Sequence, residues 1–160
     1  MGFTPVKIDS IDKRILEELQ RDASRSIEQV AQAVGLSQNP CWRRIKRLEA
    51  DGVIERRVAV VDPARVGVGV TVFVSVRTSH HSDAWLAAFA QGVEAIPEVV
   101  EFYRMSGDVD YLLKILVHDI ADYDRIYKRL IRVADLDDVS SSFAMERIKS
   151  TTEVPIPATE

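Results

Sequence analysis

Residues 26–48 have the sequence SIEQVAQAVGLSQNPCWRRIKRL, which predicts two short helices joined by a tight turn. Ser26 and Gln29 have the spacing of a capping box at the start of the first helix. Gly35 follows the last apolar residue of that helix, where a helix end favours a left-handed backbone. Ser37 can then cap the second helix. This order of elements is typical of a helix-turn-helix.

The second of these helices has an apolar side and a basic side. Cys41, Ile45 and Leu48 recur at helical spacing, so we expect them in the core. The residues predicted to contact DNA are Ser37, Gln38, Asn39, Trp42, Arg43, Arg44, Lys46 and Arg47. Asn and Gln side chains can pair with adenine, and Arg can pair with guanine. The basic side chains further along the helix suit contacts with backbone phosphates. Two alternatives stay open: the basic side is simply solvated, and Trp42 packs on a neighbouring helix rather than against the DNA backbone.

A further helix precedes this pair and completes a domain over residues 1–52. Asp9 can cap it, and Ile15, Leu16 and Leu19 fall on one face. The segment that follows, residues 53–66, is β-prone and ends near an Asp-Pro break. We interpret it as either a wing beside the DNA or a linker strand between two domains.

The remaining residues, 67–160, predict an α+β domain. The expected strands are 70–76, 99–105, 111–117 and 139–148, and the expected helices are 82–95 and 121–133. The order β-α-β-β-α-β is that of a ferredoxin-like fold, in which helices cover one face of a single sheet. The other face would carry large apolar groups. Pairing with a second copy would bury them, which predicts a homodimer or a larger even-numbered assembly.

Charge is divided unevenly along the 160 residues, whose net charge is −4. Residues 1–62 contain 11 Lys/Arg and 10 Asp/Glu, whereas residues 63–160 contain 10 and 15. A local basic face can bind phosphates even when another domain is acidic, so the asymmetry favours two domains with different partners. Apolar runs are too short to span a bilayer and no secretory signal is visible, so we expect a cytoplasmic protein. The single cysteine excludes an internal disulfide and an all-cysteine metal cage.

Several of these stretches, in this order, resemble the Lrp/AsnC (feast/famine) transcription regulators. The matching stretches are residues 11–20, 34–37, 40–49, 106–113 and 149–155, so the resemblance extends over nearly the whole chain. It implies a C-terminal domain similar to the amino-acid-binding ACT domains. It also implies dimers that associate further, often into octamers.

The resemblance implies an amino-acid effector site between sensor domains, beside a Gly-Asp loop. The residues carried over are Met105, Ser106, Gly107, Asp108 and Asp110, with Thr151 and Thr152 lining the same cleft. A glycine turn exposes backbone N–H groups to a carboxylate, and Asp108 or Asp110 could accept from an ammonium group. Within the family, residues 80–85, 103–108 and 141–146 are most similar to the members that activate cysteine breakdown, which implies cysteine as the effector.

Other functions are less well supported by the sequence. An enzyme is not expected, because no nucleophile motif or phosphate loop is present and residues 67–69 lack the rest of a dinucleotide fingerprint. No cofactor or metal is expected, since the adjacent His80 and His81 normally point in different directions. Two alternatives remain: an architectural DNA-binding protein that ignores metabolites, and a ligand sensor without DNA binding. The basic helix argues against the second.

Overall fold

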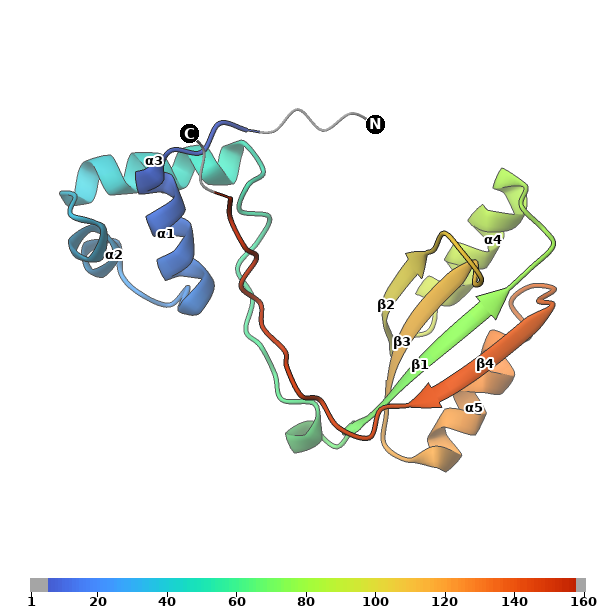
Figure 1. Ribbon diagram of the computed structural model, residues 1–160. Helices are drawn as coiled ribbons and strands as arrows, with labels where there is room; N and C mark the ends of the chain where they lie inside the picture. The colour runs from blue at the N-terminus through green and yellow to red at the C-terminus, as the bar shows by residue number, and fades with distance from the viewer. Residues whose placement is uncertain (1–5, 158–160) are drawn as a thin grey trace. The chain divides into compact units, whose positions relative to one another are not determined.

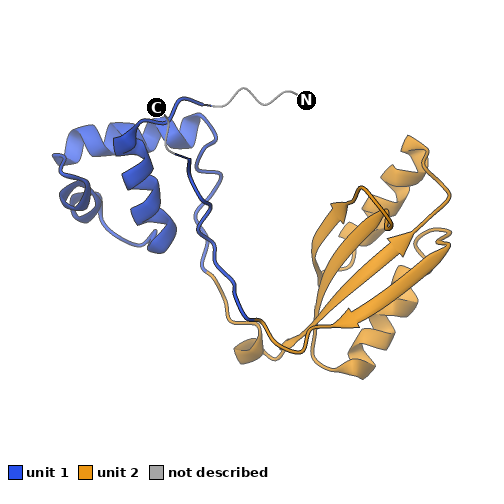
Figure 2. Cartoon of the chain, in the orientation of Figure 1, with its two compact units in different colours: residues 1–59, 148–160 blue, residues 60–147 orange. Residues whose placement is uncertain are grey.

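The computed structural model describes residues 6–157. The outer ends of the two predicted domains, residues 1–5 and 158–160, lie outside the described part. The chain forms two compact units, coloured separately in Figure 2. The helical unit contains residues up to Ala59 and returns from Ile148 onward. The sensor unit contains Val60–Arg147. Among the described residues, no helix combines the length and apolar character needed to cross a membrane.

The helical unit is built from α1 (Ser10–Arg21), α2 (Ile27–Val34) and α3 (Gln38–Ala50) (Figure 1). Asp9 and Ser26 both form complete capping boxes, in which the cap side chain and the third helical residue satisfy each other's backbone N–H groups. Gly35 ends α2 with φ of 74°, a conformation that side chains with a Cβ rarely adopt. The predicted helix-turn-helix is therefore confirmed.

One apolar core holds the three helices together. Its buried members are Ile15, Leu16, Leu19, Val30, Ala31, Val34, Cys41, Ile45 and Leu48. They include every residue that helical spacing predicts for the inner face of α3. Burial of these side chains leaves the opposite side of α3 in solvent, which is the side available to a partner.

The sensor unit is a four-stranded antiparallel sheet in the order β2-β3-β1-β4. Its elements along the chain are β1 (Val70–Arg77), α4 (Asp83–Glu94), β2 (Val99–Arg104), β3 (Tyr111–Val117), α5 (Ile120–Leu130) and β4 (Asp138–Phe143). Both helices cover the same face of the sheet, as Figure 1 shows. This is the ferredoxin-like arrangement that the sequence predicts.

The two faces of this sheet have different surroundings. Val72, Val74 and Val76 of β1 are fully buried under the helices, together with alternate residues of β3. Phe73 alternates with them and so lies on the opposite face, where it is 38% exposed. Leu112 is next to Tyr103 on that same face. No element of the described chain covers these apolar side chains.

The last strand is shorter than predicted. We expect it to continue to residue 148, but β4 ends at Phe143, which is paired with Val72. The N–H of Ala144 still donates to the carbonyl of Thr71, close to the first residue of β1. Beyond this point β1 offers no further backbone partner, so the prediction is wrong from residue 144 onward.

The segment between the two units contains no strand in the described chain. Residues 55–63 have no regular structure, and a short 3-10 helix follows at Ala64–Val66. Val53 and Ile54 follow α3, and both donate their backbone N–H groups to the carbonyl of Leu48. A strand needs a partner for its backbone groups, and residues 55–61 make no backbone hydrogen bond within the described chain.

Candidate DNA interface and effector site

The N-terminal end of α3 presents three unbonded polar side chains. Ser37 occupies the N-cap position, but its side chain makes no capping hydrogen bond. Gln38 and Asn39 follow in the first turn, and both are exposed. Because none of these side chains is committed within the described chain, they are free to bond an external partner.

The middle of α3 carries an exposed aromatic residue and an unpaired cation. Trp42 is 49% exposed and makes no ring contact with another aromatic residue of the described chain, so part of its indole is open to a partner. Arg43 is exposed and makes no hydrogen bond or ion pair within the described residues. Lys46 also faces solvent but forms an ion pair of 2.7 Å with Glu49. These residues therefore differ in how free they are to bind an anion.

Arg44 and Arg47 have partners on α1 that the sequence did not suggest. Asp12 is 1% exposed, and its carboxylate accepts from Arg44 at 2.8 Å and from Arg47. Arg44 also donates to Asp9 at 2.6 Å. A buried carboxylate is costly unless it is paired and hydrogen-bonded, so these contacts stabilise Asp12 in the interior.

The electrostatics of this network follow from its hydrogen bonds. The pKa of Asp9 is lowered to about 2, first by the hydrogen bond from the backbone of Asp12 and then by Arg44. The pKa of Arg44 is raised by the same carboxylates. Asp9 and Arg44 therefore both remain charged throughout the neutral range.

An open hollow on α3 is lined by Pro40, Arg43, Arg44 and Arg47. Three of its four lining residues carry guanidinium groups, and none carries a carboxylate. Guanidinium groups bind phosphate and carboxylate oxygens in a fixed geometry, so the hollow suits a small anion.

In the sensor unit, the predicted effector loop connects β2 to β3. Ser106, Gly107 and Asp108 are exposed and Met105 is 40% exposed. Gly107 has φ of 119°, which allows the tight turn. The backbone N–H of Met105 donates to the carbonyl of Asp110 at 2.8 Å and closes the loop.

Asp110 has a structural role that the sequence did not reveal. Its carboxylate accepts from the backbone N–H of Thr78 at 2.8 Å, and its own N–H donates to Val76. Thr78 is buried, and its hydroxyl accepts from the N–H of His80. The β1–α4 segment is thereby held beside the Gly107 loop. Thr78 and Asp110 are 32 residues apart in the sequence, so their hydrogen bond becomes evident only in the folded structure.

A cluster of aromatic rings lies under this part of the sensor unit. Trp85 stacks on His80 with ring centres 6.3 Å apart and on Phe89 at 5.0 Å. It also contacts Tyr111, the residue after Asp110. The indole N–H of Trp85 is buried without a hydrogen-bond partner. Trp85 is therefore a natural fluorescence reporter for events at the Gly107 loop.

Thr151 and Thr152 belong to a different compact unit from the Gly107 loop. Both are exposed and belong to the returning segment, which the structure groups with the helical unit. The side chain of Gln20 on α1 bonds both the N–H and the carbonyl of Val154, and Ile156 packs against the helical core. These contacts hold the segment on α1, so within one chain the seven predicted effector residues are divided between two units.

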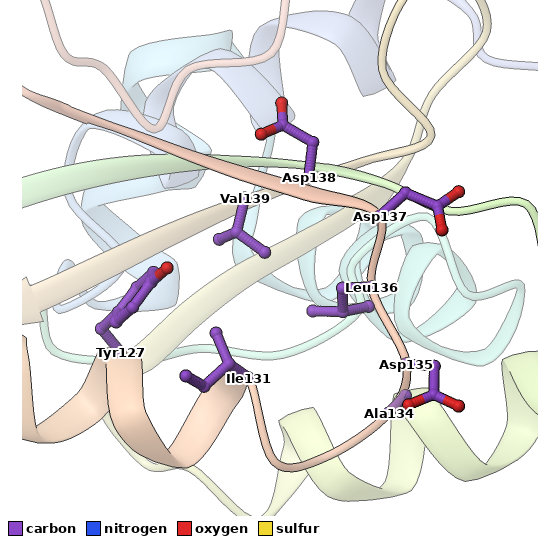
Figure 3. Close-up of a pocket in the computed structure, with 8 residues that line it drawn as sticks. All are labelled: Tyr127, Ile131, Ala134, Asp135, Leu136, Asp137, Asp138 and Val139. Atoms are coloured by element: carbon purple, nitrogen blue, oxygen red, sulfur yellow. The ribbon is translucent and has the colours of Figure 1, made fainter.

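A different hollow of the sensor unit lies between α5 and β4 (Figure 3). It is lined by Tyr127, Ile131, Ala134, Asp135, Leu136, Asp137, Asp138 and Val139. None of these residues belongs to the predicted effector set. Among the described residues, no group of three or more His, Cys, Asp or Glu side chains is placed to hold a metal ion.

Together, a helix-turn-helix unit and a ferredoxin-like unit define a class of DNA-binding transcription regulators with a ligand-binding domain. A model of winged helix-turn-helix DNA-binding domains matches residues 8–55, and the Lrp/AsnC ligand binding domain matches residues 71–154. The chain belongs to the Lrp/AsnC family of transcriptional regulators, which are not enzymes.

Individual relatives extend over almost the whole chain. The glutamate uptake regulatory protein of Zymomonas mobilis is 50% identical over 96% of this chain and 93% of its own length. The DNA-binding transcriptional activator DecR of Escherichia coli is 48% identical over 93% of this chain and 99% of its own. An AsnC family regulator from Agrobacterium tumefaciens is 57% identical, with a TM-score of 0.90 over 92% of this chain and 97% of that one. A transcriptional regulator from Neisseria meningitidis, solved with L-methionine, is 31% identical, with a TM-score of 0.88 over 93% and 97%.

Proposed function

We propose that this regulator contacts double-stranded DNA through the exposed side of α3, and that an amino acid at the Gly107 loop changes the affinity. The observation that carries the DNA half is the set of uncommitted side chains along one side of α3. Residues at the N-terminal end of such a helix reach base edges in the major groove. Gln38 and Asn39 read bases, whereas Arg43 and Lys46 contact backbone phosphates.

The effector is an α-amino acid, and cysteine is the first candidate. The exposed N–H groups of the Gly107 turn suit a carboxylate, and Asp108 is free to accept from an ammonium group. The resemblance of residues 80–85, 103–108 and 141–146 to the cysteine-responsive members supports cysteine. Glutamate is the second candidate, because one 50% identical relative regulates glutamate uptake.

The protein assembles as a homodimer through the open face of its sheet, and dimers associate into larger even-numbered assemblies, up to an octamer. The apolar side chains of Phe73, Leu112 and Leu116 on that face support this assembly. In the assembled protein, Thr151 and Thr152 of one copy complete the effector cleft of another.

Two measurements with complementary reporters test the proposal. Selection from a random pool of duplexes identifies a preferred DNA sequence, whose binding is then followed through Trp42 in a Trp85→Phe variant. The converse variant, Trp42→Phe, leaves Trp85 to report amino-acid binding. We expect DNA to quench Trp42, and the amino acid to change Trp85 emission. Absence of any preferred duplex, with Trp42 unaffected by DNA, would reject the α3 interface.

A thermal-shift screen against the common amino acids, with cysteine kept reduced, identifies the effector. A ligand at about 100 times its dissociation constant adds roughly 2.7 kcal/mol to the folded state. A shift selective for cysteine supports the first candidate, and a shift with glutamate or another amino acid replaces it. No shift with any of them favours the architectural alternative, in which the sensor unit only oligomerises.

A further inference from the structure

The arginine hollow on α3 has an unusual support. Arg43, Arg44 and Arg47 line it together with Pro40. Arg43 has no partner within the described residues. The other two arginines both donate hydrogen bonds to Asp12 of α1. The hollow therefore combines one free guanidinium group with two that are held in place.

The holding group is the carboxylate of Asp12, which is nearly inaccessible to solvent. One oxygen accepts from Arg44 at 2.8 Å, and the other accepts from Arg47 and, at 3.1 Å, from the backbone N–H of Asp9. The backbone of Asp12 is itself fixed, because its N–H donates to Asp9 at 2.8 Å in the capping box of α1. Asp12 is thus anchored at both ends, and its position determines where two guanidinium groups lie.

A fixed arginine binds an anion at a lower entropic cost than a free one. An arginine side chain loses rotamer entropy when it is immobilised. Arg44 and Arg47 have already lost part of that freedom to Asp12. Asp12 also places a negative charge near any bound phosphate, which opposes binding. The two effects have opposite signs, so removal of the carboxylate shows which of them dominates.

We propose that Asp12 is a positioning residue for DNA binding: it fixes Arg44 and Arg47 so that the hollow accepts one backbone phosphate. Asp12 does not touch DNA and acts only through the two arginines. This inference rests on the proposed role of α3. A tetrahedral phosphate group offers several oxygens to converging guanidinium donors, whereas a base edge presents a flat, in-plane pattern.

The test is Asp12→Asn, a substitution that preserves the size of the side chain and raises the net charge by one. Binding to the selected duplex is measured over a series of salt concentrations, and the active fraction is determined by titration. Simple electrostatics predicts tighter binding. Positioning predicts binding weaker by about tenfold, with a salt dependence reduced by up to about one phosphate contact. Equal or tighter binding with an unchanged salt dependence would overturn the proposal.

Two variants serve as controls. Asp51→Asn removes the same charge next to α3, because Asp51 lies 4.0 Å from Arg47 but does not line the hollow. We expect it to bind DNA as well as, or slightly better than, the parent protein. Equal weakening in Asp51→Asn and Asp12→Asn would show that the effect does not depend on the buried contacts of Asp12, and would contradict positioning.

Arg43→Ala separates this proposal from the wider one. If Arg43→Ala weakens binding while Asp12→Asn does not, the α3 interface stands and the positioning role fails. If neither changes binding, the α3 interface itself fails. Should Asp12→Asn melt below the assay temperature, Asp9→Asn replaces it. That variant keeps a good N-cap residue and removes one carboxylate from Arg44, so we expect weakening of about threefold.

Discussion

Arg43 and Arg44 are neighbours in the chain but have different surroundings. Arg43 faces solvent without a partner among residues 6–157, whereas Arg44 bridges two carboxylates of the α1 N-terminus. The charge pattern of the sequence treats both as part of one basic side. It could not reveal the difference, because Asp12 lies 32 residues away and appears from its spacing to be an ordinary first-turn acid.

Substitution of these two arginines should therefore have distinct effects. We expect Arg43→Ala to weaken binding to the selected duplex by about tenfold and leave the melting temperature unchanged. Arg44→Ala should weaken binding similarly and also destabilise the helical unit by about 1–3 kcal/mol, because it leaves Asp12 with fewer partners. Fluorescence anisotropy and thermal denaturation measure the two quantities. Equal stability of the two variants would contradict the structural role of Arg44.

The pKa of Asp9, lowered to about 2, makes a further prediction at this scale. A carboxyl group whose pKa is lowered by folding stabilises the protein above its unfolded value of 3.8, and this contribution disappears as pH falls toward 2. Because Asp9 is 45% exposed, solvent screening limits the contribution to about 1 kcal/mol.

Asp9→Asn keeps the N-cap but loses the charge. We expect its unfolding free energy to lie about 1 kcal/mol below that of the parent protein at neutral pH. The difference should close near pH 2. Urea denaturation at several pH values measures it. A difference that is independent of pH would show that the ionisation of Asp9 is not its origin.

Among the elements, the segment after β4 departs most from expectation. Continued strand pairing is predicted from its composition, but β1 offers no partner beyond Thr71 and the chain returns to α1 instead. The attachment depends on the amide of Gln20, which bonds the backbone of Val154 as a neighbouring strand would. Arg21 and Glu153 add an ion pair of 3.5 Å.

Gln20→Leu should release this segment, because leucine can neither donate to nor accept from the backbone of Val154. With two hydrogen bonds lost at about 1 kcal/mol each, we expect the helical unit to be destabilised by about 1–2 kcal/mol. We also expect faster proteolysis within residues 148–157. Gln32→Leu, on an exposed position of α2 without a side-chain bond, is the matched control. Identical cleavage patterns in the two variants would contradict the attachment.

The regular elements were predictable because local signals and burial agree. Capping residues mark the starts of α1 and α2, alternation marks β1, and a short apolar run marks β3. The candidate site was only partly predictable. The exposed residues of α3 follow from helical periodicity, whereas the bond between Asp110 and Thr78 depends on tertiary proximity. Resemblance to a family, rather than periodicity, was needed to single out the Gly107 loop.

For the whole molecule, the proposed assembly depends on the open face of the sheet. Phe73 is central to that face and is 38% exposed in the single chain. Phe73→Asp should convert the assembly to monomers, because dimerisation would bury an unpaired carboxylate. Sedimentation velocity measures the change. A second variant, Ser142→Asp, tests the edge of the same face, because Ser142 is paired with Phe73 on edge strand β4. Persistence of the parent assembly in Phe73→Asp would place the interface elsewhere.

We propose that amino-acid binding in the sensor unit changes DNA binding by the helical unit. The most direct measurement is the dissociation constant for the selected duplex, determined without effector and with each amino acid at saturation. Linkage between sites typically amounts to 1–3 kcal/mol, so we predict that one amino acid, with cysteine the first candidate, changes the affinity by about 5-fold to 150-fold. An affinity that is the same with every amino acid would contradict the account and leave a DNA-binding protein whose ferredoxin-like unit does not regulate it.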